Sequence, residues 1–339
     1  MAENEPPEKI FELGNAFVAS QALMVADEIE LFTAVDDADG LTRREIEEQF
    51  DFAHHHGVRD FLDLLVAHEL LSRDGDTYRL TGLSEQYLLP DRDTYVGDYL
   101  LLSRHRMYES ATDLRSALET GDPQNELTSG ETLYEDGNVY ATPEAREGFQ
   151  DAMRSLSTFP TRWIAAEVNW SQFDRVCDLG TAKGTLARRI AESSDCEVIG
   201  FDLPDAEPGF VSYTAESDAA ERLEFHAGNF FEDALPSADA YAFGHILNDW
   251  SGSEKRELVQ KTYDSLPADG ALFVHETMLD DDRTENRFGL YMNMITLLEL
   301  RGGYCATVES YETLLEDVGF SDVQRRDIPG AETLLVGYK

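Results

Sequence analysis

A glycine-bearing turn between two apolar runs constrains the fold of this chain more than any other feature. The run Val176–Leu179 ends at Gly180, Gly184 follows, and the apolar spacing over 186–192 predicts a helix. A second run ends at Asp202, about 20 residues past the turn, where a carboxylate can accept both hydroxyls of a ribose. The order of strand, turn, helix and strand predicts half of a nucleotide-cofactor site.

The turn lacks the features that bind phosphate. A dinucleotide fingerprint has three glycines as GxGxxG, and a P-loop has GxxxxGK[ST]. Here Asp178 and Gly180 are followed by Gly184 alone. This pattern suits a ligand with a ribose and no phosphate, such as S-adenosylmethionine, because an acidic residue tolerates a sulfonium and repels a pyrophosphate. A glycine turn in some other α/β protein is the alternative on this segment alone.

The C-terminal half alternates strand-like and helical segments, which predicts a doubly wound α/β sheet. The strand-like runs lie at 223–226, 240–243, 271–274, 323–326 and 333–338. The last two are separated by a Pro-Gly connection too short for a crossover helix, so they should pair antiparallel. A parallel sheet closed by an antiparallel last strand is the class I methyltransferase variant of this fold.

The charge balance indicates an unusual solvent. The chain has 68 acidic and 27 basic residues, a formal net charge of −41, and only five of the basic residues are lysines. Such a chain repels itself in dilute buffer, whereas salt at about 1 M screens charge over about 3 Å. We interpret the evenly spread acidic residues as a halophilic surface. Nucleic acid is not expected as a partner, because phosphate binding needs clustered Lys and Arg.

The N-terminal region predicts a small, mainly α domain with the element order of a winged helix. Helical patterns and a short Asp-Gly hairpin lie at 11–33, 42–49, 58–71 and 72–80. DNA binding would require a basic recognition helix, but the segment 57–71 offers only Arg59 against three acidic residues. We therefore expect this domain to serve another purpose.

No segment predicts export or membrane insertion. The first ten residues are acidic and contain prolines, and no uninterrupted apolar run approaches the ~20 residues of a membrane span. Cys177, Cys196 and Cys305 form no CxxC pattern and cannot all pair. We expect a soluble, cytoplasmic protein without a membrane partner. The triplet His54–His56 is interpreted as a solvated helix start, and no metal site is expected.

Six segments of the C-terminal half form an ordered set of motifs. They are Asp178–Gly184, Phe201–Pro204, Gly228–Phe231, Gly244–Trp250, Asp280–Arg283 and Gly302–Gly303. In this order and spacing they resemble the plant-type, acetylserotonin-like O-methyltransferases and their bacterial and archaeal relatives. The resemblance implies a winged-helix dimerisation domain over 1–95, linking helices that contribute to the substrate pocket over 96–170, and a SAM-binding domain over 171–339. It also implies a homodimer that acts on a small-molecule methyl acceptor.

The resemblance further implies which residues hold S-adenosylmethionine. They are Asp178, Gly180, Thr181, Gly184, Asp202, Leu203, Asn229 and Phe230. Two positions depart from the family pattern. Asn229 replaces an aspartate, and its carbonyl can still hydrogen-bond the adenine amino group. Gly244 replaces a lysine that helps to hold the cofactor.

Catalysis is where this chain departs most from the resembled family. The histidine that takes the proton from the acceptor hydroxyl in that family is Asn248 here, and asparagine cannot act as a base. By position, Asp249 follows it, Glu276 would orient the base, and a second family carboxylate falls on Cys305. A positioned base contributes about 10²–10⁴-fold, whereas orientation and desolvation can contribute ~7–11 kcal/mol. We therefore hypothesise transfer by proximity, with Asn248 and Asp249 positioning the acceptor.

Several alternatives stay open at this point. An acceptor that needs no deprotonation, such as a thioether, a thiolate, an ionised phenol or a stabilised carbanion, would allow S- or C-methylation. His245 or His275 could replace the missing base. The cofactor could serve hydroxylation or decarboxylation instead, or the chain could be a silent, ligand-sensing dimer.

The acceptor pocket is the least defined part of the sequence. Long helices are expected over 95–118 and 145–168, with a polar loop over 121–138. Phe149 and Met153 on the second of these, and Tyr291 and Met292 on a later helix, are candidates for an apolar or aromatic pocket. Ordinary core packing explains them equally well.

Overall fold

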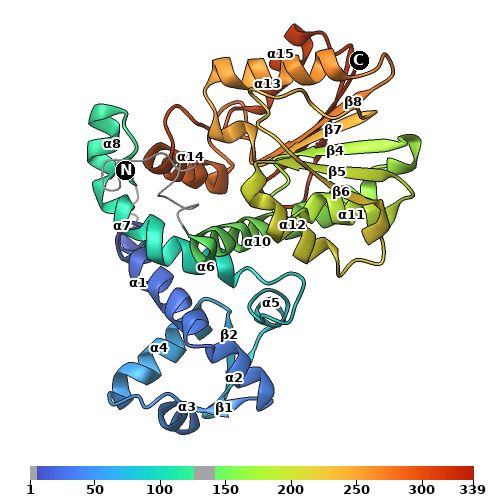
Figure 1. The fold of residues 1–339 in the computed structure, drawn as a ribbon. Coiled ribbons are helices and arrows are strands. Elements are labelled where there is room, and N and C mark those ends of the chain that lie inside the picture. Colours follow the sequence, from blue (N-terminus) through green and yellow to red (C-terminus); the bar gives the residue numbers. More distant parts are fainter. Residues whose placement is uncertain (1–5, 126–141) are drawn as a thin grey trace. The chain divides into compact units, whose positions relative to one another are not determined.

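The computed structural model describes residues 6–125 and 142–339, so part of the expected loop over 121–138 lies outside the described residues. The chain divides into two compact units, Met1–Arg106 and Met107–Lys339. Figure 1 shows helices and a small sheet in the first unit and a large sheet between helices in the second.

The N-terminal unit consists of short helices around a three-stranded antiparallel sheet of order β1-β3-β2. Its elements are α1 (Glu8–Glu28), α2 (Leu31–Asp37), β1 (Leu41–Thr42), α3 (Arg43–Gln49), α4 (His55–Ala67), β2 (Leu71–Asp74), β3 (Thr77–Leu80), α5 (Gly82–Tyr87) and α6 (Gly97–Leu102). Thr42 and Glu45 form a capping box that fixes the start of α3. The expected hairpin is confirmed, because β2 and β3 pair antiparallel across the Asp-Gly turn.

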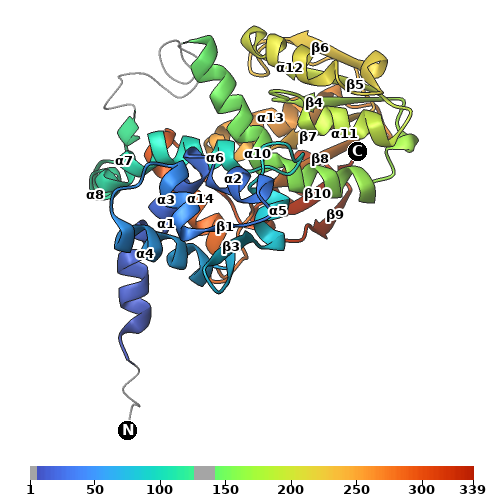
Figure 2. The same cartoon turned by 90° about the horizontal axis from the view of Figure 1, so that it is seen from below.

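The first half of α1 exposes apolar side chains. Ile10 and Leu13 are 72% and 71% exposed, and Phe11, Phe17 and Val18 are exposed as well. Figure 2 shows these turns of α1 extending away from the other helices of the unit. An apolar helix face of this kind is typical of a surface that another chain covers.

The C-terminal unit is built on a seven-stranded sheet of order β6-β5-β4-β7-β8-β10-β9. The strands are β4 (Arg175–Leu179), β5 (Glu197–Asp202), β6 (Leu223–Ala227), β7 (Ala240–Gly244), β8 (Ala271–Glu276), β9 (Asp322–Asp327) and β10 (Thr333–Tyr338). The strands from β6 to β8 are parallel, and β10 pairs antiparallel with both β8 and β9. The expected antiparallel last strand is therefore confirmed, and the sheet has the class I methyltransferase topology.

Helices cover both faces of this sheet (Figure 1). One apolar core packs α13 (Gly252–Ser265) and α15 (Val308–Val318) against the sheet, and the other packs α10 (Pro143–Glu167), α11 (Thr185–Ser193) and α12 (Glu207–Thr214). Neighbouring residues of β4 divide between them, Val176 on one side and Cys177 on the other. All three cysteines are buried and unpaired.

The first of the two expected long helices is interrupted. Instead of one helix over 95–118, the chain forms α6, a π turn over Ser103–Met107, α7 (Tyr108–Ser110), a 3₁₀ turn and α8 (Leu114–Thr120). Irregular helical turns of this kind are strained and short, and the division between the two units falls in the π turn. The second long helix is confirmed as α10. The C-terminal unit also contains α14 (Arg287–Glu299).

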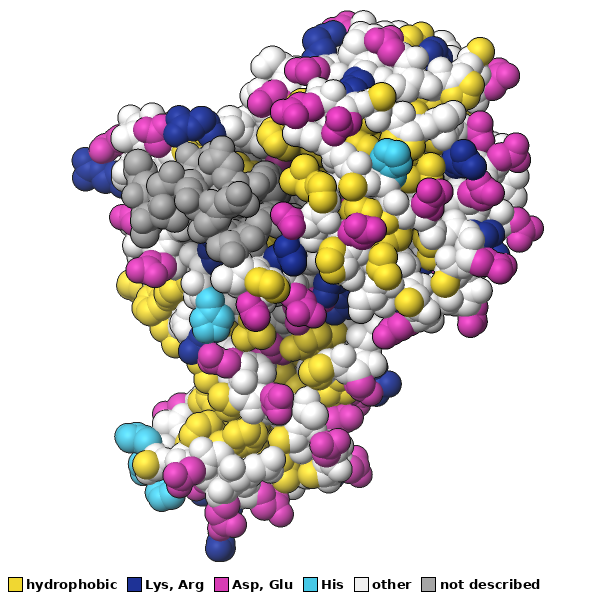
Figure 3. Space-filling view, viewed as in Figure 1, with side chains coloured by type: hydrophobic (Ala, Val, Ile, Leu, Met, Phe, Trp, Pro, Cys, Tyr) yellow, Lys and Arg dark blue, Asp and Glu magenta, His cyan; other side chains and the backbone are white. Residues whose placement is uncertain are grey.

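Acidic side chains are spread over both units. Figure 3 shows Asp and Glu on every part of the visible face of the described residues, with Lys and Arg scattered among them. Among residues 6–125 and 142–339, no helix combines the length and apolar character that are needed to cross a bilayer.

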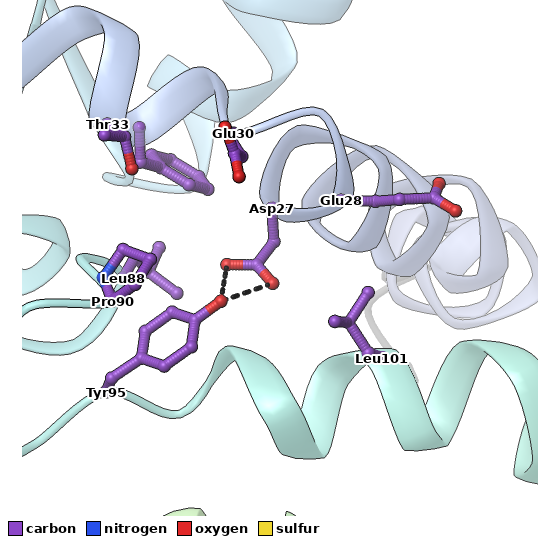
Figure 4. Close-up of a pocket in the computed structure, with 9 residues that line it drawn as sticks. Asp27, Glu28, Glu30, Thr33, Leu88, Pro90, Tyr95 and Leu101 are labelled. Carbon is purple, nitrogen blue, oxygen red and sulfur yellow. Dashed lines mark hydrogen bonds between the residues drawn. The ribbon is translucent and has the colours of Figure 1, made fainter. Parts of the chain in front are cut away.

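A buried carboxylate lies inside the N-terminal unit. The Tyr95 hydroxyl donates to both Asp27 oxygens, at 3.3 and 3.1 Å, beside a small cavity between α1, α2 and the segment 88–101 (Figure 4). Burial raises the pKa of Asp27 to about 6. The lining contains no residue that the sequence assigns to the cofactor or to catalysis, so we regard this cavity as a structural feature.

The substitution Asp27→Asn should stabilise the protein at pH 7. Because the pKa of Asp27 is raised in the folded state, stability is lost as the pH rises from about 4 through the folded-state pKa of about 6, and the loss is complete above it. The amide keeps an acceptor for Tyr95 and removes the charge, so unfolding at pH 7 should require roughly 1–3 kcal/mol more. Denaturant unfolding at pH 5 and 7 measures this, with exposed Asp60→Asn as the control. An equal gain at both pH values would contradict the assignment.

Candidate functional site

The turn after β4 is tied to the next strand of the sheet. Gly180 and Gly184 adopt left-handed φ values of +75° and +83°. The Gly180 N–H donates to the Phe201 carbonyl at 2.8 Å, which fixes the turn against the end of β5. The predicted glycine turn therefore lies at the carboxyl edge of the parallel strands, where open α/β sheets bind their ligands.

Two carboxylates flank this turn, of which Asp178 is buried and Asp202 is half-buried. Asp202 at the end of β5 accepts the Ala182 and Leu203 N–H groups at 2.8 and 2.7 Å. Asp178 accepts the Thr181 hydroxyl at 2.7 Å. Burial raises the pKa of both carboxyls to about 6. The two acids give the turn a negative field that favours a cationic ligand.

The loop after β6 contains the other two residues assigned to the cofactor. The Asn229 side-chain carbonyl accepts the Phe231 N–H at 2.9 Å, so one of its lone pairs is used within the loop. The Asn229 N–H donates to Asp233, and Lys261 donates to the Phe230 carbonyl at 2.6 Å. These bonds hold the loop at the same edge of the sheet as Asp202, since Ala227 and Asp202 are register partners.

Glu276 at the end of β8 holds the backbone of the loop that contains Asn248. One of its oxygens accepts the Ile246 and Leu247 N–H groups at 3.0 and 2.7 Å. The side chain is fully buried, and burial raises its pKa to about 7. The sequence assigned Glu276 to orienting a base, whereas its hydrogen bonds in the structure go to the loop itself.

Asn248 is held in a fixed orientation. Its side-chain carbonyl accepts the Tyr311 hydroxyl at 2.8 Å, and its amide donates to the Thr277 carbonyl at 3.3 Å. Asn248 is 8% exposed, and Tyr311 is 1% exposed. The sequence analysis did not identify Tyr311, because a tyrosine at helical spacing is indistinguishable from core packing. Asp249 is the next residue of the same 3₁₀ turn, Leu247–Asp249.

The paired glycines lie directly against this turn. A Cβ on Gly303 would come within 2.9 Å of the Asn248 carbonyl oxygen and within 2.7 Å of the Asp249 one, so a side chain would displace the turn. Lys255 donates to the Trp250 and Tyr304 carbonyls at 2.9 and 2.8 Å. The lysine therefore joins the end of the turn Leu247–Asp249 to the segment after the paired glycines, and burial lowers the pKa of Lys255 to about 8.

Cys305, to which the sequence resemblance assigns the second family carboxylate, is buried. Its backbone is clamped by the Asn293 side chain, which accepts the Cys305 N–H at 2.8 Å and donates to the Cys305 carbonyl at 3.1 Å. Burial raises the pKa of the thiol to about 12, so it remains protonated at neutral pH. The thiol is neither a base nor a nucleophile in this environment.

His245 and His275 meet a carboxylate that the sequence analysis missed. His245 Nε2 lies 3.1 Å from Glu332 Oε1, and His275 Nδ1 lies 3.5 Å from Glu332 Oε2. The Glu332 charge raises the pKa of His245 to about 9 in spite of burial, and the His245 charge holds that of Glu332 at about 2. Glu332 directly precedes β10, and the first residue of β10 pairs with Glu276 of β8. This antiparallel register places Glu332 beside the two histidines.

The four expected pocket residues lie on two helices of the C-terminal unit. Phe149 on α10 is 9% exposed, and Met153 is half-buried. On α14, Met292 is half-buried and Tyr291 is 59% exposed. The Tyr291 side chain is therefore largely exposed to solvent in one isolated chain.

A cofactor turn at the sheet edge, next to a loop held by Glu276, defines the site of a class I methyltransferase. The chain matches the family model of the O-methyltransferase domain over residues 112–321 and that of the O-methyltransferase dimerisation domain over residues 11–90. It belongs to the O-methyltransferase family. Members of this family depend on S-adenosylmethionine, and the second match supports a homodimer.

Two relatives match nearly the whole chain. The tetracenomycin polyketide synthesis 8-O-methyl transferase TcmO of Streptomyces glaucescens is 33% identical over 98% of this chain and 97% of its own length. The N,N-dimethyltransferase OxyT of Streptomyces rimosus is 31% identical over 97% and 96%. The solved structure of human N-acetylserotonin methyltransferase in complex with SAM is 26% identical, covers 100% of this chain and 99% of its own, and has a TM-score of 0.89.

The residues present fit S-adenosylmethionine. Asp202 offers a half-buried carboxylate at the end of β5, where an acidic residue can accept ribose hydroxyls, and the turn supplies no cluster of basic side chains that would prefer a phosphate. The negative field of Asp178 and Asp202 suits a sulfonium, because opposite charges attract strongly where water is excluded.

The substitution Asp202→Asn should weaken binding of S-adenosylhomocysteine about tenfold or more. The substitution would replace hydrogen bonds between the ribose and a charged carboxylate by hydrogen bonds to a neutral amide. A hydrogen bond to a charged group contributes roughly 1.5–3 kcal/mol. Calorimetric titration in concentrated KCl at pH 8 measures the change, with exposed Asp218→Asn as the matched control. Equal affinity in the wild type and Asp202→Asn would remove Asp202 from the cofactor site.

Proposed function

We propose that this protein transfers a methyl group from S-adenosylmethionine to a small aromatic acceptor that is already ionised when it reacts. The observation that carries the proposal is the state of Asn248. The family resemblance assigns Asn248 to the position of the catalytic histidine. Its side chain has no basic nitrogen, and Tyr311 and Thr277 hold it in place. A rigid, neutral residue can position an acceptor and cannot deprotonate it.

The neighbouring groups do not replace the missing base. The Cys305 thiol has a pKa of about 12, and Glu276 uses one carboxylate oxygen to bind two backbone amides. His245 has a pKa of about 9 and is therefore mainly protonated at neutral pH. The acceptor consequently has to arrive as a competent nucleophile.

Proximity supplies the rate in this proposal. The cofactor provides an electrophilic methyl on a positively charged sulfur. An incoming phenolate is negative, so charge is neutralised as the new C–O bond forms and the S–C bond breaks. Exclusion of water by the buried Asn248 and Leu247 region strengthens this attraction, and alignment of the reacting atoms can contribute ~7–11 kcal/mol.

An aromatic hydroxyl of low pKa is the acceptor class that we favour. The relative TcmO is named an 8-O-methyl transferase of tetracenomycin polyketide synthesis, and the match covers 98% of this chain. The aromatic and sulfur side chains of Phe149, Met153, Tyr291 and Met292 suit a planar apolar molecule.

A neutral amine is the second candidate. The relative OxyT is named an N,N-dimethyltransferase and is 31% identical. A neutral amine attacks through its lone pair and needs no base before the bond forms, so Asn248 serves it equally well. Detection of the cofactor's methyl group in the product would distinguish both candidates from a hydroxylase, a decarboxylase or a dimer without catalytic activity.

We also propose that the enzyme works in concentrated salt inside the cell. Its net charge of −41 is the support for high salt, and three buried, unpaired cysteines are the support for a reducing interior.

The substitution Asn248→His should extend activity to weakly acidic phenols. A histidine could remove the proton that the wild type cannot, so kcat/KM for a phenol of pKa near 10 should rise about 10–100-fold. A phenol that is ionised at the assay pH should gain little. Initial rates of S-adenosylhomocysteine formation with phenols of graded pKa measure this pattern. An equal gain for all phenols would contradict a missing-base explanation.

The substitution Asn248→Ala should lower turnover about tenfold for every acceptor. It removes two buried hydrogen bonds that fix the turn, and it leaves the Tyr311 hydroxyl without its acceptor. Exposed Asn169→Ala is the matched control. Wild-type turnover in Asn248→Ala, with unchanged S-adenosylhomocysteine affinity, would remove Asn248 from the mechanism.

A further inference from the structure

The cluster of His245, His275 and Glu332 does not take part in the proposed methyl transfer. The three residues come from different parts of the chain. His245 directly follows β7, His275 lies near the end of β8, and Glu332 directly precedes β10. One nitrogen of each histidine and one carboxylate oxygen all lie within 4.8 Å of one another. The side chains of His275, Glu332 and His245 are 2%, 9% and 14% exposed.

Three polar atoms of this cluster lack hydrogen bonds of good geometry. His245 Nε2, His275 Nδ1 and Glu332 Oε2 are buried, and within the described part of the chain none of them makes a hydrogen bond of good geometry, although the two nitrogens lie 3.1 and 3.5 Å from Glu332 oxygens. Buried polar atoms normally form hydrogen bonds, and the binding of an ion is one of the standard reasons for an exception. The three orphaned atoms all belong to residues that ligate metals.

We propose that His245, His275 and Glu332 bind a divalent transition-metal ion of the zinc class. Two imidazoles and one carboxylate form a common ligand set for Zn²⁺, with a fourth position filled by water. Bonds of 2.0–2.1 Å to a tetrahedral ion place neighbouring ligand atoms about 3.4 Å apart. His245 Nε2 lies 3.1 Å from Glu332 Oε1 and His275 Nδ1 lies 3.5 Å from Glu332 Oε2, so each imidazole nitrogen has one carboxylate oxygen at about this distance.

The backbone around the cluster is shaped to hold these side chains. A Cβ on Gly244 would lie 2.0 Å from His275 Nε2, so only glycine leaves room for the imidazole. The His245 N–H donates to the His275 carbonyl at 3.2 Å, and the two rings are nearly perpendicular at a centroid distance of 5.3 Å. His275 Nε2 faces Gly244, and its Nδ1 therefore faces the carboxylate.

The surrounding charge favours a cation. Glu276 and Asp249 add to the negative field that Glu332 exerts on His245. A bound ion would join β7, β8 and β10 directly beside the loop that contains Asn248. The site would be structural, because none of its ligands is among the residues that position the acceptor. The proposal does not depend on methyl transfer.

Metal analysis of the full-length protein tests the proposal. After incubation with Zn²⁺ and dialysis, the wild type should retain about one ion per chain, and Co²⁺ should give the visible bands of a four-coordinate site with nitrogen ligands. Glu332→Gln preserves the shape of the carboxylate and should lower the retained metal at least tenfold. Zn²⁺ should raise the Tm of the wild type and leave that of Glu332→Gln unchanged.

Two variants distinguish this cluster from adventitious binding. Replacing His54, His55 and His56 by alanine removes the exposed triplet at the start of α4, and His68→Ala removes another exposed histidine; both should retain the ion. Loss of metal from the triplet variant with retention in Glu332→Gln would overturn the proposal. So would a folded wild type that retains no Zn²⁺ and gives no cobalt bands, since the cluster would then be an ion pair only.

Discussion

The buried Glu276 carboxylate is the interaction on which the site depends. It is the last residue of β8, and it accepts two consecutive N–H groups of the loop that follows β7. This places a loop without regular hydrogen bonding at the edge of a rigid sheet, and Asn248 takes its position from it. A carboxylate that loses these donors in a dry interior would be strongly destabilising, so the loop and the charge stabilise each other.

Other contacts fix the same loop from different sides. Tyr311 binds the Asn248 side chain, Lys255 binds the Trp250 carbonyl, and Gly303 permits close approach of the glycine loop. These contacts hold a neutral amide at the position that we assign to the catalytic residue. In the proposed mechanism the loop therefore contributes geometry, and alignment rather than proton abstraction provides the rate enhancement.

The sequence predicted the sheet well and the polar contacts less well. The turn from Gly180 to Gly184 and the antiparallel last strand follow from local patterns, because glycine spacing and a short connection restrict the backbone directly. The contact of Asn248 with Tyr311 depends on how α15 packs against the sheet, and the position of Glu332 depends on strand register across it. No local pattern encodes contacts between residues 63 or 87 positions apart in the chain.

The interrupted helix illustrates the same limit. The apolar spacing over 95–118 fits a continuous helix, yet the chain forms a π turn over Ser103–Met107. Hydrophobic periodicity predicts which side chains are buried. It does not predict a π turn, in which one turn of the helix contains an additional residue. His245 and His275 were treated as possible bases because each histidine was considered without its partner carboxylate.

The pH dependence of single-turnover methyl transfer tests the central claim most directly. Two phenols whose pKa values differ by about two units are compared with the same wild-type enzyme. If the acceptor must arrive ionised, the inflection in the rate should move with the pKa of the phenol. An inflection at one pH for both phenols would reveal a titrating base in the enzyme and would contradict transfer without one.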